Sequence, residues 1–144
     1  MDSASPRLQK LAHRLLVLER QSGHRSEEAA AFHVTEKLRQ RLSMLTGAAG
    51  FRAVLARSLA LAGQEVKWLG AIRVDARGSL EALNEVCARM PADEIARGEE
   101  ALIAHLIGLL VTFIGASLTA YLLQDIWPEV SPQDLSPEME ENGG

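Results

Sequence analysis

The sequence predicts an all-α fold: a single-domain helical bundle of about five helices around a long hydrophobic C-terminal helix, with room for one short extended insert. The main observation is the segment Ala101–Leu123, which contains no Asp, Glu, Lys or Arg. It is much longer than an ordinary strand of about 5 to 6 residues, so it is expected to be a buried helix. Upstream segments carry apolar residues at helical spacing, and these amphipathic faces need a common hydrophobic helix to cover.

Two amphipathic helices are expected at the start of the chain. The first begins at Pro6 with Ser5 as its N-cap, because serine accepts a hydrogen bond there and proline fits the first helical position. The second begins at Ser26, which precedes two glutamates that favour a helix N-terminus. It is expected to end at Gly47, a natural C-terminal residue.

A third helix is expected over Ala48–Ala62, closed by Gly63. The segment Val66–Gly78 lacks helical periodicity, which predicts a short extended piece followed by a turn. Ser79 is then expected to cap a fourth helix, which Pro91 ends.

The hydrophobic helix is expected to start after Pro91 and to end near Trp127, because the proline at 128 disfavours helical geometry in the residue before it. Six residues of this helix follow each other at alternating steps of four and three, which places them on one face: Ala101, His105, Gly108, Thr112, Gly115 and Thr119. Glycine inside a helix costs about 0.5–1 kcal/mol relative to alanine. Gly108 and Gly115 are therefore interpreted as places where another helix comes close, in the same chain or in a second subunit.

A transmembrane span is the alternative interpretation of this segment. A span needs about 20 consecutive apolar residues, and Tyr121 and Trp127 would then lie at one interface. Acidic residues flank the run closely, however, and no Lys or Arg anchors either end. A buried core helix in a cytoplasmic protein is therefore the leading interpretation, with insertion into an inner membrane through Ala101 to Leu123 as the alternative.

Composition narrows the classes of function. The formal net charge of -4 argues against nucleic-acid binding by the whole chain. The single cysteine, Cys87, excludes an internal disulfide and a multi-cysteine metal site. Its position on an apolar helix face predicts an unreactive thiol. The N-terminus leads into a charged helix without the apolar core of a signal peptide, which also favours the cytoplasm.

The sequence contains no short enzyme motif and no paired metal ligands, so we assign no catalytic residue, no metal site and no cofactor. His105 is interpreted as a core histidine that bonds to a neighbouring helix, with a general base or ligand-binding residue as the alternative. Trp68 lies in the irregular segment, where an exposed aromatic side chain would contact a partner and a buried one would cap the core.

These observations predict a small, non-enzymatic helical interaction or regulatory protein that binds a protein partner or a second copy of itself. Residues 1–127 are expected to form the helical domain, and residues 128–144 a flexible acidic tail rich in proline. Two alternatives stay open: a single-span membrane protein with a cytoplasmic helical domain, and a ligand-binding bundle or enzyme that uses His105 in an internal cavity.

Overall fold

The described part of the chain is almost entirely helical, which confirms the predicted all-α, single-domain bundle. The computed structural model describes residues 5–22 and 29–130. In chain order the elements are α1 (Pro6–Gln21), α2 (Ala30–Glu65), the 3-10 helix η1 (Lys67–Ala71), β1 (Arg73–Val74), β2 (Leu80–Glu81), α3 (Leu83–Cys87), α4 (Ala92–Ile114) and α5 (Ala116–Ile126).

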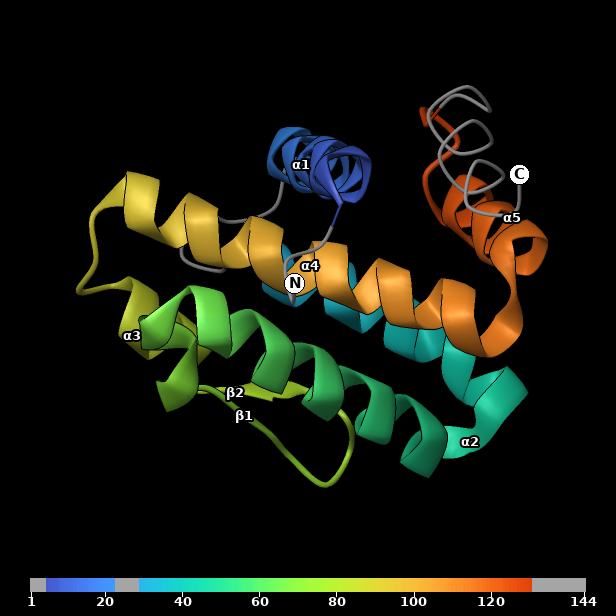
Figure 1. Ribbon diagram of the computed structural model, residues 1–144, viewed down its shortest axis with the longest axis horizontal. Helices are drawn as coiled ribbons and strands as arrows, with labels where there is room; N and C mark the ends of the chain where they lie inside the picture. The colour runs from blue at the N-terminus through green and yellow to red at the C-terminus, as the bar shows by residue number, and fades with distance from the viewer. Residues whose placement is uncertain (1–4, 23–28, 131–144) are drawn as a thin grey trace.

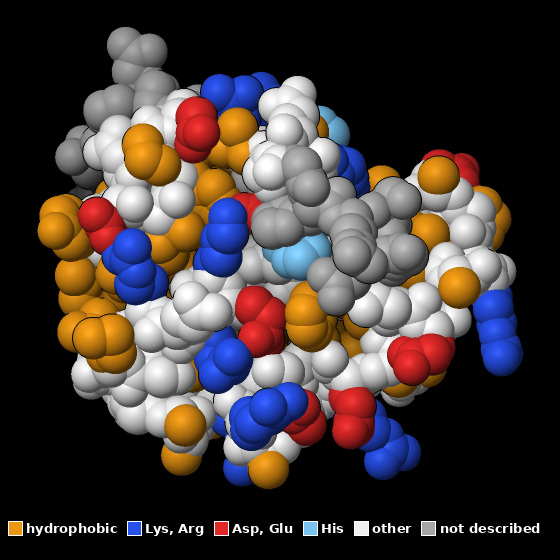
Figure 2. Space-filling model, turned by 180° about the vertical axis from the view of Figure 1, so that it is seen from behind, with side chains coloured by type: hydrophobic (Ala, Val, Ile, Leu, Met, Phe, Trp, Pro, Cys, Tyr) orange, Lys and Arg blue, Asp and Glu red, His pale blue; other side chains and the backbone are white. Residues whose placement is uncertain are grey.

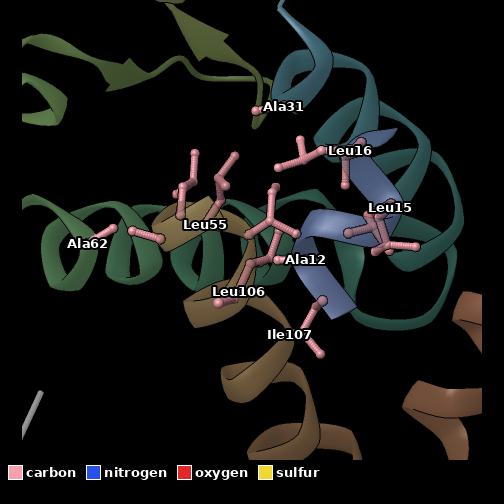
Figure 3. Packing of buried hydrophobic residues seen from close by; sticks show 14 of the residues in the cluster. Ala12, Leu15, Leu16, Ala31, Leu55, Ala62, Leu106 and Ile107 are labelled. Carbon is pink, nitrogen blue, oxygen red and sulfur yellow. The ribbon is translucent and has the colours of Figure 1, made fainter. Parts of the chain in front are cut away.

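Helix α4 lies at the centre of the molecule, between α1 and the long helix α2 (Figure 1). Side chains from these three helices point toward one another and form the core (Figure 3). The labelled residues of this core have no exposed surface: Ala12, Leu15, Leu16, Ala31, Leu55, Ala62, Leu106 and Ile107. The hydrophobic helix is therefore covered on both sides by the amphipathic faces that the sequence shows.

The start of α1 agrees with the sequence prediction. Ser5 is the N-cap, its Oγ accepts a backbone N–H at 3.2 Å, and proline follows at the first helical position. The predicted N-cap of the second helix, Ser26, lies outside the described residues. The described helix begins at Ala30, and the buried Glu99 of α4 accepts the Ala31 N–H there at 3.0 Å. A carboxylate from a neighbouring helix thus satisfies one of the free N–H groups at this helix start.

Helix α2 consists of two helical segments joined at Gly47, whose φ of 82° and ψ of 159° are not helical. The predicted break at this residue is confirmed. The predicted end of the next helix at Gly63 is wrong, because the helix continues to Glu65 and the Val66 N–H still donates to the Ala62 carbonyl at 2.9 Å.

The irregular segment forms η1 and an antiparallel hairpin of β1 and β2. Asp75 closes its turn by accepting the N–H groups of Ser79, at 3.0 Å, and of Arg77, at 2.9 Å. The hydrogen bond from Ser79 is the main cause that lowers the pKa of Asp75. The prediction that Ser79 caps the fourth helix is wrong, because the residues after it pair in β2 and the helix that follows, α3, is only Leu83–Cys87.

The expected end of the hydrophobic helix near Trp127 is also wrong. Helix α4 ends at Ile114, and Gly115, with a φ of 92° and a ψ of 158°, turns the chain into α5. Packing then reaches Val130, which is fully buried and whose N–H donates to the Trp127 carbonyl at 3.0 Å. The rest of the expected tail, residues 131–144, lies outside the described residues.

Candidate functional site

Two glycine elbows lie at the same end of the molecule. One is Gly47 within α2, and the other is Gly115 between α4 and α5. The bend of α2 and the junction of α4 and α5 lie at the same end of the ribbon (Figure 1, right). Both have a positive φ, which a glycine adopts without the steric cost that an L side chain incurs. The chain changes direction at both elbows, within α2 at Gly47 and between α4 and α5 at Gly115.

Exposed apolar side chains gather at these elbows. In the part of the chain that the structure describes, five large hydrophobic residues are exposed, and each lies within six positions of an elbow glycine. They are Met44, Leu45, Phe113, Leu118 and Tyr121, and we call them the elbow surface. Met44 is 83% exposed, Tyr121 66% and Phe113 65%. Figure 2 shows hydrophobic side chains along the corresponding edge of the molecule.

The elements that carry this surface are fixed in place. Arg41 of α2 forms an ion pair with Asp125 of α5, and the Trp127 indole N–H donates to the buried Glu19 of α1 at 2.7 Å. Glu19 also accepts from Lys37 of α2 at 2.6 Å. These contacts hold α5 against α1 and α2, so the exposed side chains project from a defined scaffold.

The surface is also free of charge. Neither the stretch 42–51, around the α2 elbow, nor the stretch 101–124, around the second elbow, contains Asp, Glu, Lys or Arg. Exposed apolar surface that lacks charged groups resembles the central part of a protein–protein interface. The arrangement can therefore exclude water against a second apolar surface.

The structure separates the six residues that the sequence places on one helix face. Ala101 and His105 are buried in α4, and Gly108 lies close to Leu8 of α1, where an added Cβ would come within 3.3 Å of Cδ1. Thr112 also lies in α4 but is exposed, and its Oγ1 donates to the Gly108 carbonyl at 3.1 Å. The last two belong elsewhere: Gly115 forms the elbow and Thr119 lies in α5. The predicted close helix approach therefore applies to Gly108, while an added Cβ at Gly115 would meet nothing within 4 Å.

His105 contacts a neighbouring helix, as one of its two interpretations expected. Its Nε2 lies 2.5 Å from Oε2 of Glu65 in α2, and the ring is only 7% exposed. Within residues 5–22 and 29–130, no group of three or more His, Cys, Asp or Glu side chains is arranged to hold a metal ion. The geometry assigns His105 a role in joining α4 to α2.

Trp68 covers part of the core instead of extending into solvent. The indole N–H donates to the Glu94 carbonyl at 3.0 Å, and the ring lies directly against Gly98 of α4. Of the two interpretations of Trp68, the geometry matches the core cap. The tight contact at Gly98 was missed in the sequence because it depends on the position of η1.

Sequence reasoning also missed the elbow surface. Its members look like ordinary helix residues, since Phe113 and Leu118 fall inside the hydrophobic run. The signal in the sequence was a glycine soon after an apolar pair. Gly47 stands two positions after the pair Met44–Leu45, and Gly115 directly follows the pair Phe113–Ile114. A glycine inside an apolar run can allow close helix packing, or it can end the helix. Where it ends the helix, the apolar residues next to it can become exposed.

The lengths of the apolar helical segments bear on whether this chain could span a membrane. Among the described helices, α2 is long and apolar enough to cross a membrane, and it is broken at Gly47. The uncharged part of α4 runs only from Ala101 to Ile114, which is about 21 Å of helix. A hydrocarbon core is about 30 Å thick, so this part of α4 alone is too short to span it.

Comparison with known proteins gives no relative: no protein-family model, no curated protein and no solved structure matches this chain.

Proposed function

We propose that this protein is a small, non-enzymatic interaction protein that associates with a second copy of itself through the elbow surface. The observation that supports the proposal is the concentration of all five exposed large hydrophobic side chains of the described residues at the two elbows. Scattered apolar residues on a surface need no explanation, whereas a cluster of this kind marks an interaction site.

Self-association suits a surface without charge. A two-fold dimer brings the same patch of both copies together, so a charged group near the axis would face its own copy. The elbow surface avoids this repulsion because the charged residues nearest to it in the sequence, Arg41 and Asp125, already pair with each other.

The expected energy is of the right size for a dimer. Burial of a large apolar side chain contributes about 1.5–3 kcal/mol, and a two-fold interface buries each member of the elbow surface twice. Association costs about 4–15 kcal/mol in lost translational and rotational freedom. Because the five side chains are already partly covered in the monomer, their further burial in both copies is of the same order as this cost.

A mass measurement tests the proposal. By light scattering, the wild-type chain is expected to have twice the mass of the 15.7 kDa monomer at high concentration. Phe113→Glu places a charge on the elbow surface and is expected to reduce the mass to that of the monomer, with unchanged helix content.

The matched control is Ala76→Glu, which adds the same charge at an exposed position in the hairpin turn. It is expected to leave the dimer intact. A monomeric wild type, or equal loss of mass in both variants, would refute self-association through this surface. Recovery of the wild type only in the membrane fraction would favour the membrane alternative instead.

A further inference from the structure

A second surface feature lies on the segment of α2 beyond its elbow. This segment and the η1–β1 connection lie side by side (Figure 1). Their side chains line an open groove of about 760 Å³. The α2 wall includes five small residues about one helical turn apart: Ala49, Ala53, Ala56, Ala60 and Gly63. The opposite wall includes Leu69, Ile72 and Val74. Leu69 and Ile72 are buried, so the apolar surface open to an incoming chain is that of the exposed alanines and of the half-buried Val74. An incoming chain can approach the α2 backbone closely along these alanines.

Three cations line this groove, and we call them the rim cations: Arg52, Lys67 and Arg73. All three are exposed, and none forms an ion pair with a described residue. Other cations of the described chain do pair: Arg20 with Glu99, Lys37 with Glu19, Arg39 with Glu36 and Arg41 with Asp125. Glu81 stands opposite Arg73 in the hairpin without forming an ion pair. The groove therefore presents unneutralised positive charge around an apolar floor.

We propose that residues 131–144 of the same chain bind in this groove as an acidic ligand. This segment contains four carboxylates, Asp134, Glu138, Glu140 and Glu141, and no Lys or Arg. The described residues carry 14 Lys and Arg against 12 Asp and Glu, a net charge of +2. Leu135 and Met139 add two apolar side chains for the floor. Charge and apolar character of the segment thus complement the groove that the same chain forms.

The segment is long enough to reach the groove. The four carboxylates stand 4 to 11 positions after Val130, which corresponds to about 13–36 Å of extended chain, and α4, which crosses the molecule, is about 35 Å long. Single ion pairs at an exposed rim are weak, but a tether keeps the ligand at an effective concentration in the millimolar range. We therefore expect a reversible contact that salt weakens, because salt screens exposed charges.

A spin label on the segment tests this docking in the full chain. Cys87→Ser removes the native thiol, and Ser136→Cys provides the attachment site for a nitroxide. The labelled, ¹⁵N-enriched chain is diluted into excess unlabelled chain of natural isotope content, so that broadening of its amide signals reports its own segment. At about 20 mM salt, the signals of Ala53, Ala56 and Ala60 are expected to be lost, and at about 500 mM salt they are expected to return.

Two charge-reversal variants make the test specific. Arg52→Glu with Arg73→Glu reverses two rim cations and is expected to restore the signals at low salt. The control, Arg89→Glu with Arg97→Glu, makes the same change in net charge at two exposed arginines that do not line the groove, and is expected to leave the broadening unchanged. Unbroadened amide signals of Ala53, Ala56 and Ala60 at low salt, in the labelled chain with its native rim cations, would overturn the proposal. Equal recovery of these signals in both charge-reversal variants would also overturn it.

Discussion

Gly98 lies directly against the Trp68 indole, and a Cβ added at Gly98 would come within 2.3 Å of ring atom Cζ2. Real Cβ atoms do not make contacts this short, so the ring or the helix would have to move. The indole is also fixed by its hydrogen bond to the Glu94 carbonyl, which limits that movement. At the scale of single residues, this contact joins η1 to α4 and closes one side of the core.

We predict that Gly98→Ala destabilises the protein by about 1–3 kcal/mol, the usual cost of overpacking a close contact. Gly63→Ala is the matched control, because an added Cβ there meets nothing within 4 Å and the residue lies inside α2. This control is expected to stabilise the protein by about 0.5–1 kcal/mol, since alanine favours a helix over glycine. Urea unfolding of both variants measures the difference, and equal stabilities would show that Trp68 does not pack against Gly98.

Cys87 is predicted to react slowly with alkylating reagents. Burial raises the pKa of its thiol to about 11, and the nearby Glu99 carboxylate adds to the effect. Because a raised pKa keeps the thiol protonated below pH 11, the reactive thiolate is scarce at pH 8. Iodoacetamide is expected to modify the unfolded chain at least about tenfold faster than the folded chain at pH 8, with the gap narrowing as the pH rises toward 11. A folded thiol that reacts at the unfolded rate would contradict this environment.

At the scale of elements, helical segments end at the two elbow glycines, Gly47 and Gly115. The sequence predicts α1, its cap and the break at Gly47, because capping residues and glycine act locally. It fails at Gly115, since apolar residues continue on both sides and composition alone does not reveal a change of direction. It fails again after Ser79, where pairing in the hairpin overrides the helical spacing of the apolar residues. Gly98 and Gly115 look alike in the sequence, yet one lies under a tryptophan and the other turns the chain.

We predict that Gly115→Ala and Gly115→Leu destabilise the protein by similar amounts, about 1–3 kcal/mol, because a φ of 92° with a ψ of 158° is a conformation that is essentially restricted to glycine. The cost arises from a positive φ with an L side chain, and it depends little on side-chain size because the space around Gly115 is open. Thermal unfolding compares the two with Gly108→Ala, whose φ is helical. That control is expected to be nearly neutral, because only the end of the Leu8 side chain must shift. A leucine variant far worse than the alanine variant would indicate close packing around the elbow.

At the scale of the whole molecule, the fold class follows from the sequence because four amphipathic segments need one hydrophobic helix to cover. The candidate site does not follow in the same way. Met44 and Phe113 are far apart in the sequence, and only the arrangement of α2 against α4 brings their elbows to one end of the bundle (Figure 1). The result is a molecule with a covered core and one apolar end that a second copy is proposed to cover.

Tyr121 gives the most direct test of this proposal, because it is the only tyrosine of the chain and belongs to the elbow surface. With ¹³C-labelled tyrosine, the relaxation that a soluble gadolinium chelate causes measures the exposure of the ring. Self-association through the elbow surface predicts that Tyr121 is accessible in dilute solution and becomes protected as the protein concentration rises, while Phe113→Glu keeps it accessible throughout. A Tyr121 ring that stays equally accessible at every concentration in the wild-type protein would contradict the account.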